Sequence, residues 1–364
     1  MHRRTFLQSM AAAAAVPALA APATGIRLGF DTYSLRAFGW KDIQLIDYAA
    51  AQQLDTIQIS SLNDFSSLEP AHLKQVREHA GSAGIALDGG TGCICSASKS
   101  WKPKDGSPEQ VITKGLEVSR AIGATSMRCY MGSSDDRQSP DQLARCMDET
   151  IQVFRKMKSR AQNLNVKIAL ENHAGDMQAR EVRTIIEQSG KDFVASCLDT
   201  GNPMWVMENP LVTLDVLGPY VVTTHVRDSA VFETPEGAAA QWVALGDGVV
   251  DLTTFVTRYR EVCPQAGMQL EIITGRPPRR LPYLRQDYWR NFSAMPASEF
   301  ARFVEMAKHG HPFMGTMVIE DAPGVRNPAY AAALKEQQRV DLERSLAYAK
   351  EVLGVGLKAA KTRA

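Results

Sequence analysis

Short runs of consecutive apolar residues recur along the chain, separated by longer segments with apolar residues at every third or fourth position. The short runs do not alternate apolar and polar side chains, which is the pattern of strands buried on both faces of a parallel sheet. They predict eight strands, at Ile26–Phe30, Thr56–Ser60, Ile85–Asp88, Thr125–Tyr130, Val166–Glu171, Phe193–Asp199, Val221–His225 and Met268–Ile273.

The longer segments have the spacing of amphipathic helices, and several begin with a proline, which suits the first helical turn. Eight strands that alternate with eight helices predict an α/β fold, a (β/α)8 TIM barrel. One long insertion, 275–327, separates the eighth strand from the last helix. The predicted helices are Lys41–Gln53, Pro70–Ala83, Pro108–Ile122, Pro140–Asn163, Ala179–Ser189, Asn209–Leu217, Leu252–Val262 and Pro328–Leu353.

The first twenty residues have the layout of an export signal. Adjacent Arg3 and Arg4 precede a weakly apolar run that ends in a small-residue cleavage site at Ala20, which is typical of a twin-arginine signal peptide. The alternative is an ordinary signal peptide that happens to carry two arginines. We therefore expect residues 1–20 to be removed by the twin-arginine export machinery and residues 21–364 to form a single barrel domain, periplasmic or otherwise exported.

The composition excludes several classes of protein. With 45% hydrophobic and 22% charged residues among 364, the chain has enough apolar side chains for a large core. Its 41 Lys and Arg nearly balance 40 Asp and Glu, for a net charge of +1, so no overall field favours nucleic acid or an anionic membrane. No apolar stretch reaches the roughly 20 residues of a membrane span. Six cysteines are too few for a disulfide scaffold, and we expect most to be reduced and packed.

The predicted strands of the second half of the barrel end in acidic or imidazole side chains. Glu171, Asp199 and His225 end the fifth, sixth and seventh strands, and Glu271 lies in the eighth. Because the carboxyl ends of barrel strands form one rim, we expect these four side chains to converge. Three carboxylates and one imidazole suit one divalent ion, with Mn2+ expected first and Co2+, Zn2+ or Mg2+ as alternatives. Each residue alone could be a helix cap or a core group, but four in register predict a metal site.

Several motifs carry a family resemblance. They are Ala169-Leu-Glu-Asn-His173, Cys197-Leu-Asp-Thr-Gly-Asn202, Thr224-His-Val-Arg-Asp228, Leu245-Gly-Asp-Gly248 and Leu270-Glu271. Together they resemble the xylose isomerase-like TIM barrels, and specifically the sugar phosphate isomerase/epimerase group, which includes ketose 3-epimerases and 3-keto-glycoside lyases. The resemblance covers about residues 25 to 355 in pattern, with the specific motifs confined to the last four strands.

The resemblance implies roles for the four strand-end residues. All four would bind the metal, and Glu171 and Glu271 would also be catalytic, exchanging protons with the carbon beside the substrate carbonyl. This chemistry is physically sound, because a cation that chelates a carbonyl and a neighbouring hydroxyl stabilises an enediolate while carboxylates remove and return the proton. A carboxylate bound to a cation is a weakened base, so the metal must acidify the C–H by more than it weakens the base.

Neighbouring residues are candidates for substrate binding, namely His173, Asn202, Arg227 and Asp228. His173 has an equally good interpretation as a structural histidine. Asn202 departs from the family pattern, since ketose 3-epimerases have a histidine there, and an amide cannot act as an acid near neutral pH. The resembled barrels also include, more distantly, metal-dependent endonucleases that bind three zinc ions through several further histidines. Too few histidines are left outside the four-residue group for such a site, which argues against nucleic-acid processing.

Other residues are candidate pocket walls. Asp31, Tyr33 and the glycine run Gly89–Gly92 are expected at the ends of the first and third strands, and three tryptophans fall in predicted rim loops. The insertion holds the aromatic residues Tyr283, Tyr288, Trp289 and Phe292 and a predicted helix, Ser298–Lys308. Because aromatic residues are scarce in disordered segments, we expect either a lid whose rings stack on a sugar or a packing element and subunit contact of a homo-oligomer. The tryptophans are Trp101, Trp205 and Trp242.

The sequence therefore predicts an exported, divalent-metal-dependent isomerase or epimerase that acts on a small-molecule sugar or glycoside through an enediolate. A lyase or dehydratase using the same site on 3-keto-glycosides or keto-sugars is the alternative reaction, because an enediolate can also expel a leaving group. Asn202 shifts the balance slightly towards elimination. A third hypothesis, from another class, is a non-catalytic carbohydrate-binding barrel, which the presence of both Glu171 and Glu271 disfavours.

Overall fold

Eight parallel strands form the centre of the computed structural model, which describes residues 24–263, 265–315, 319–321, 324 and 327–361. Each strand pairs in parallel with the next in the order β10-β1-β2-β3-β4-β5-β6-β7, and a bridge between Val226 and Leu270 joins the two ends of the sheet. The predicted (β/α)8 barrel is confirmed. The strands are β1 (Leu28–Asp31), β2 (Thr56–Ile59), β3 (Ala86–Cys93), β4 (Ser126–Tyr130), β5 (Lys167–Glu171), β6 (Val194–Asp199), β7 (Val221–His225) and β10 (Met268–Leu270).

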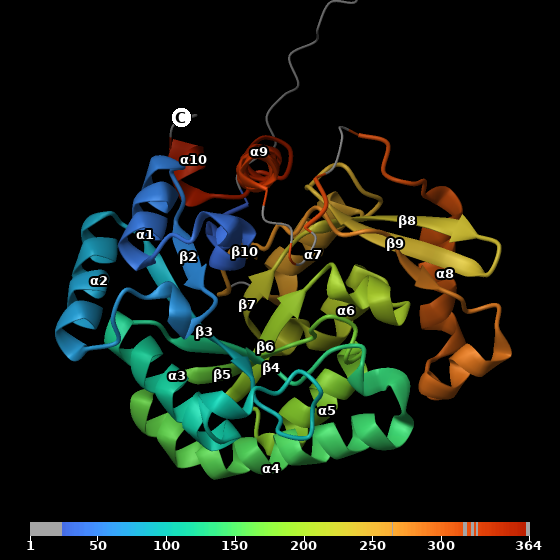
Figure 1. The fold of residues 1–364 in the computed structure, drawn as a ribbon, viewed down its shortest axis with the longest axis horizontal. Coiled ribbons are helices and arrows are strands. Elements are labelled where there is room, and N and C mark those ends of the chain that lie inside the picture. Colours follow the sequence, from blue (N-terminus) through green and yellow to red (C-terminus); the bar gives the residue numbers. More distant parts are fainter. Residues whose placement is uncertain (1–23, 264, 316–318, 322–323, 325–326, 362–364) are drawn as a thin grey trace, which may run out of the picture.

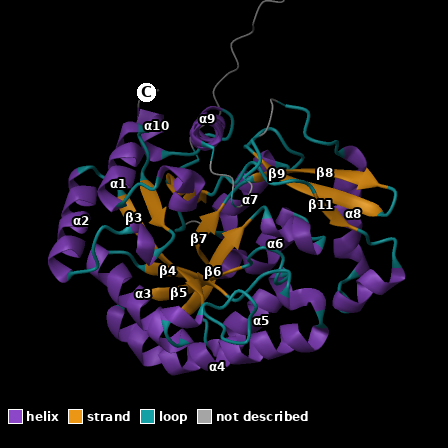
Figure 2. Ribbon diagram, viewed as in Figure 1, coloured by secondary structure: helices purple, strands orange, loops and turns teal. Residues whose placement is uncertain are grey.

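Helices follow the strands and cover the outside of the barrel (Figures 1 and 2). The predicted prolines start α2, α3 and α4, and the Ser107 hydroxyl accepts a hydrogen bond from the Gln110 amide to close a capping box on α3. The barrel helices are α1 (Asp42–Ala51), α2 (Pro70–Ser82), α3 (Pro108–Ile122), α4 (Pro140–Leu164), α5 (Ala179–Ser189), α6 (Pro210–Leu217), α7 (Leu252–Val262) and α9 (Pro328–Glu351), and a short α10 (Leu357–Lys361) follows.

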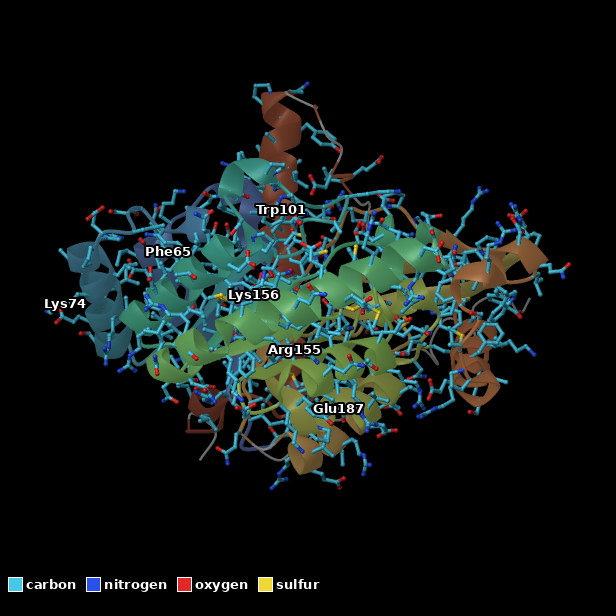
Figure 3. The ribbon with its side chains drawn as sticks, turned by 90° about the horizontal axis from the view of Figure 1, so that it is seen from below. Phe65, Lys74, Trp101, Arg155, Lys156 and Glu187 are labelled. Atoms are coloured by element: carbon cyan, nitrogen blue, oxygen red, sulfur yellow. The ribbon has the colours of Figure 1, made fainter. Side chains whose placement is uncertain are left out.

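The helix α4 shows how one amphipathic segment separates core from solvent. Its residues Phe154 and Met157 are buried against the barrel, whereas Arg155 and Lys156 lie on its outer face (Figure 3). Lys156 reaches Glu109 of the neighbouring α3 at 2.8 Å. The apolar spacing that predicted the helix thus also sets which face packs inward.

A small antiparallel sheet projects from the barrel between His225 and the last barrel strand, in a segment where the apolar pattern predicts no strand. A hairpin of β8 (Asp228–Thr234) and β9 (Gly237–Val243) pairs with β11 (Arg279–Leu281) of the insertion. The helix α8 (Ala297–His309), which confirms the predicted helix of the insertion, packs against β8 on the same side of the molecule (Figure 1). This segment is therefore an extension of the fold that pairs with part of the insertion.

The glycine run at the third strand has a packing role that differs from the expectation of a strand end. Gly89 and Gly90 lie inside β3, where an added Cβ would meet the Ser119 hydroxyl oxygen at 2.1 Å and the Ser60 carbonyl oxygen at 2.7 Å. Glycine is needed because α3 and β2 approach the strand this closely. The end of the run, at Gly92, borders the cavity described below.

Three further expectations concern the chain as a whole. The predicted signal peptide, residues 1–20, lies outside the described residues. All six cysteines are buried free thiols, as expected for packed side chains. In the described parts of the chain, no helix is both long enough and apolar enough to cross a membrane.

Candidate metal centre

The barrel rim brings the four predicted ligands together. Glu171, Asp199 and His225 are the last residues of β5, β6 and β7, and Glu271 directly follows β10. Register places Asp199 opposite His225 on adjacent strands. One donor atom from each of the four residues lies within 4.8 Å of the others, and all four side chains are buried, with Glu271 the most exposed at 4%.

The imidazole of His225 is the centre of the cluster. Its Nδ1 lies 3.2 Å from Glu171 Oε1, 3.6 Å from Glu271 Oε2 and 4.0 Å from Asp199 Oδ2, and it makes no hydrogen bond to the described residues. An unpaired buried nitrogen facing three carboxylates is costly by itself. A divalent cation bound by the four donors would satisfy it, so the residues present fit a metal ion of the borderline class.

The opposite ring nitrogen is held from inside the barrel. His225 Nε2 lies 3.3 Å from Asp31 Oδ2 and contacts the Gln58 side-chain amide. Gln58 is itself fixed, since its Nε2 donates to Asp31 at 3.0 Å and its Oε1 accepts from the Thr223 hydroxyl at 2.8 Å. Carboxylates commonly orient metal-binding histidines in this way. Asp31 is therefore behind the centre rather than a wall of the pocket.

Two buried arginines balance the carboxylates. Arg128 pairs with Glu171, and Arg227 pairs with Asp199 and lies with Nη1 2.7 Å from Glu271 Oε2. Burial alone would raise the pKa of Glu171, but Arg128 and His225 hold it well below its usual value. Burial raises the pKa of Asp199 to about 7 although Arg227 opposes the shift.

The same field acts on the histidine. Burial opposes a charge on the imidazole, but Cys197, Glu271 and Glu171 raise the pKa of His225 well above its usual value. A site that favours an imidazolium has an excess of negative charge, which is what a bound cation would neutralise. Cys197 is an alternative donor beside Glu171 and His225, but burial raises the pKa of its thiol to about 11, which favours the oxygen-rich set of four.

A cavity of about 540 Å³ opens above the cluster. Glu271 lines it, whereas Glu171, Asp199 and His225 are not among the described residues that line it. The cavity also contains Asn202 and Arg227 together with Tyr33 of the first strand end. The size is within the range of small-molecule sites. The proposed metal group thus lies at the bottom of the cavity, and one of its three carboxylates, Glu271, faces the open space.

Comparison with known families decides the relationship of this barrel. A family model described as the xylose isomerase-like TIM barrel matches residues 27–277, which is more than half of the chain. The chain belongs to this family. The resemblance seen in the strand-end motifs is confirmed.

Two kinds of relative are found. Over 241 residues the chain is 24% identical to the 3-oxo-isoapionate decarboxylase of Pectobacterium atrosepticum, covering 62% of this chain and 77% of that protein. A D-psicose 3-epimerase crystallised in the presence of D-fructose shares the fold with a TM-score of 0.58 and 16% identity, over 90% of this chain and 100% of that one. The IOLI protein with a bound zinc atom has a TM-score of 0.53 and 14% identity, over 78% and 95% of the two chains.

Two predicted substrate contacts line the cavity of this family member with defined partners. His173 stacks on Tyr130 with ring centroids 3.9 Å apart, and its Nδ1 lies 2.6 Å from the Gly132 carbonyl oxygen. Because a carbonyl only accepts, Nδ1 carries the proton and Nε2 is left as an acceptor; burial lowers the pKa of His173 to about 4. Asn202 donates from Nδ2 to Glu171 Oε1 at 3.2 Å. Both residues thus combine a structural bond with a place in the cavity wall.

The structure gives Asp228 a different position from the one expected. Its carboxylate accepts hydrogen bonds from the backbone amides of Ser229, Gly246, Gly248 and Val250, and it is not among the described residues that line the cavity. These bonds fasten the base of the hairpin. Asp228 is therefore a structural residue, whereas Arg227, one position earlier, lines the cavity.

The aromatic residues fall into two groups. Trp205 and Trp242 stack with ring centroids 4.1 Å apart and line the cavity, although Trp242 lies on β9 rather than in a rim loop. Trp101 packs against the core outside this wall. The insertion aromatics pack mainly among themselves and on α8, as in the Tyr283–Phe300 pair at 5.1 Å. Of the two interpretations of the insertion, its aromatic residues fit the packing element.

Sequence reasoning missed two residues that hold the proposed ligands in place. Arg128 lies in the middle of β4 and Gln58 inside β2, and both side chains are buried. A charged or amide side chain inside an apolar strand is the signal that marks them, because such a group needs a buried partner.

Proposed function

We propose that this protein is a divalent-metal-dependent enzyme that removes a proton beside the carbonyl of a sugar and forms an enediolate. One observation carries the proposal: Glu271 belongs to the four-donor cluster and also lines the cavity above it. A carboxylate in that position can reach both a bound cation and a substrate carbon. Family membership supports the same class of chemistry.

The metal ion would be held by Glu171, Asp199, His225 and Glu271. When bound, a divalent cation polarises a carbonyl oxygen and stabilises the negative charge that develops on it. We propose Mn2+ as the first candidate, with Co2+, Zn2+ and Mg2+ as alternatives; zinc is the ion in the IOLI structure. Although burial opposes the shift, Arg128 and His225 hold the pKa of Glu171 well below its usual value. A carboxylate with a low pKa is a weak base, so Glu171 suits a ligand more than a base.

The residues around the cavity perform the remaining steps. Glu271 accepts the proton, and Arg227, with Nη1 at 2.7 Å, fixes the orientation of that carboxylate. His173 offers Nε2 as an acceptor for a substrate hydroxyl. The stacked pair of Trp205 and Trp242 presents an apolar wall, which excludes water from one side of the cavity and suits the C–H face of a sugar.

Two products are compatible with this site. Protonation of the same carbon from the opposite face, by an acid on that face, gives an epimer, and return of the proton to the neighbouring carbon gives an isomer. Epimerisation or isomerisation is the leading proposal. Loss of a leaving group from the next carbon gives a lyase, and Asn202 favours this alternative because an amide beside Glu171 cannot deliver a proton. The relative named as a decarboxylase also belongs to the bond-breaking class.

A solvent-exchange experiment tests the proposal. Mature protein from residue 21, loaded with Mn2+, is incubated in D2O with free ketoses and separately with 3-keto-glycosides, and the products are followed by NMR. Metal-dependent deuterium beside the carbonyl without aglycone release supports the isomerase or epimerase. Aglycone release supports the lyase. Neither signal in either panel would refute catalysis of this class and favour a non-catalytic carbohydrate-binding barrel.

Two isosteric variants separate the roles of the glutamates. Glu271→Gln should abolish deuterium exchange while the sugar still binds, because the pocket-facing base is lost. Glu171→Gln should weaken Mn2+ binding, measured by calorimetry, because a buried ligand loses its charge. If Glu171→Gln removes exchange at full metal occupancy, Glu171 is also a base, as the family resemblance implies.

Export is proposed from the amino-terminal residues alone. The adjacent Arg3 and Arg4 favour the twin-arginine route, which carries folded proteins. Replacing both by lysine in the full-length chain should retain the precursor in the cytoplasm, whereas the parent chain should be found in the periplasm and begin near residue 21 by amino-terminal sequencing. Unchanged fractionation of the double variant would contradict this route.

A further inference from the structure

We propose that the substrate carries an anionic group, a carboxylate or a phosphate, which Lys102 and Arg276 bind at the cavity wall while the carbonyl end lies over Glu271. The inference rests on the site of the proposed function and specifies its substrate class. Among the described residues, four cationic side chains line this cavity, Lys102, Arg128, Arg227 and Arg276, against one carboxylate, Glu271. A site for a neutral sugar needs hydrogen-bonding groups but no such excess of positive charge.

The two deep cations are already neutralised. Arg128 is paired with Glu171, and Arg227 is paired with Asp199 and Glu271. These arginines therefore belong to the balance of the metal cluster. They do not account for the charge of the rest of the cavity wall.

The other two cations are not balanced in this way. Lys102 is exposed, lines the cavity, and its ammonium has no ion-pair partner in the described parts of the chain. Arg276 has its guanidinium 3.8 Å from Asp321 Oδ2, but Arg36 already binds the same oxygen at 2.5 Å. One carboxylate between two arginines leaves a positive charge beside the cavity.

The positions of these cations suit a substrate with two different ends. Lys102 comes from the segment between β3 and α3, and Arg276 from the start of the insertion, whereas Glu271 and Asn202 mark the floor near the proposed metal. A cavity of about 540 Å³ is large enough for a small sugar acid or sugar phosphate. Lysine interacts with an anion as a point charge, and arginine can bind a carboxylate or a phosphate, so the proposal covers both kinds of anionic substrate.

Matched ligands test the proposal by binding rather than by turnover. Mn2+-loaded mature protein is titrated calorimetrically with D-fructose, D-fructuronate and D-fructose 6-phosphate, and with D-tagatose and D-tagaturonate as a second pair. We expect an anionic ligand to bind about tenfold more tightly than its neutral partner, as for hydrogen bonds to a charged group. The advantage should shrink in 0.5 M NaCl, because partly exposed charges are screened. The tighter of fructuronate and fructose 6-phosphate identifies the anion.

Two variants and a matched control assign the effect to residues. Lys102→Gln and Arg276→Gln should each reduce the affinity for the anionic ligand about fivefold, the effect of one partly exposed ion pair, and leave the neutral sugar within about twofold. Lys104→Gln, an exposed lysine of the same loop that does not line the cavity, should change neither affinity. Manganese content is measured for every variant and should stay constant.

Either of two results would overturn the proposal. One is that charged and neutral members of both pairs show no difference in binding. The other is that Lys102→Gln and Arg276→Gln weaken neutral and anionic ligands equally, or no more than Lys104→Gln does. Failure of the proposed reaction is a separate result, seen as absent deuterium exchange while the preference for the anionic ligand persists.

Discussion

Replacing Arg128 with methionine should destabilise the metal-free protein strongly. Arg128 is buried at 6% exposure and pairs with Glu171 at 0%, and methionine keeps most of the aliphatic volume while removing the charge. Removing one partner of a buried pair costs about 3–5 kcal/mol, because the other charge is left uncompensated. For a chain of this length that corresponds to a fall in Tm of about 4–7 °C.

Thermal unfolding followed by circular dichroism measures this effect. Arg160→Met is the control, because Arg160 pairs with Glu117 on the surface with 45% and 42% of the side chains exposed, and such pairs contribute about 0–1 kcal/mol. The double variant Arg128→Met/Glu171→Gln should recover part of the loss, since no buried charge is then left alone. Mn2+ should raise the Tm of Arg128→Met by more than it raises that of the parent, because the cation supplies the missing countercharge.

The reasoning is refuted if Arg128→Met lowers Tm no more than Arg160→Met does. It is also refuted if the loss of stability in the double variant exceeds the summed losses of the two single variants. Either result would mean that Glu171 is compensated by groups other than Arg128.

Three further predictions concern the fold and the positioning of the site. Burial raises the pKa of Glu208 to about 7, so the folded state holds the carboxyl proton more tightly than the unfolded state. Stability should therefore fall by about 3 kcal/mol as pH rises from about 4.5 to 7. In Glu208→Gln, which has no proton to lose, Tm should fall less between pH 5 and pH 8 than in the parent. Gly201→Ala places a Cβ 2.3 Å from Arg227 Nε, and the displaced guanidinium should lower the rate of deuterium exchange about 100-fold. Asp42 accepts a hydrogen bond from His72 at 2.7 Å; burial alone would raise the pKa of Asp42, but this bond and bonds from backbone amides lower it. Asp42→Asn should therefore cost about 2 kcal/mol of stability at pH 7, and the difference in stability between parent and variant should close as pH falls below 4 in urea unfolding curves.

The barrel and the position of its four polar strand ends could be predicted because both depend on local sequence. Largely apolar runs mark strands buried on two faces, and the acidic or imidazole residue that ends each of β5, β6 and β7 falls at the rim by the regularity of the fold. Glu171, Asp199 and His225 follow from this rule alone. That the group binds a metal stays a prediction.

The hairpin could not be predicted from the same signals. The strand β9 begins Gly237-Ala-Ala-Ala, and alanine has a low strand propensity. Its pairing with β11 joins residues 238–240 to residues 279–281, a contact that local patterns do not encode. The position of Asp228 has the same origin, since this residue begins the hairpin strand β8 and no longer belongs to the barrel rim.

The supporting contacts of the site were missed because each of them joins two different strands of the barrel. Gln58 and His225 are 167 positions apart, and Arg128 reaches Glu171 from the neighbouring strand. Such pairs depend on the closure and register of the sheet, which the sequence does not state residue by residue. Only the presence of a polar side chain within a buried strand indicated that a partner had to exist.

A crystal of the mature protein grown with Mn2+, with anomalous scattering recorded at the manganese edge, is the most direct test of the central claim. The account predicts one anomalous peak per chain, bonded to Glu171, Asp199, His225 and Glu271, and its loss in His225→Asn under the same conditions. A peak elsewhere, or no peak at a Mn2+ concentration that saturates the parent in calorimetry, would contradict it.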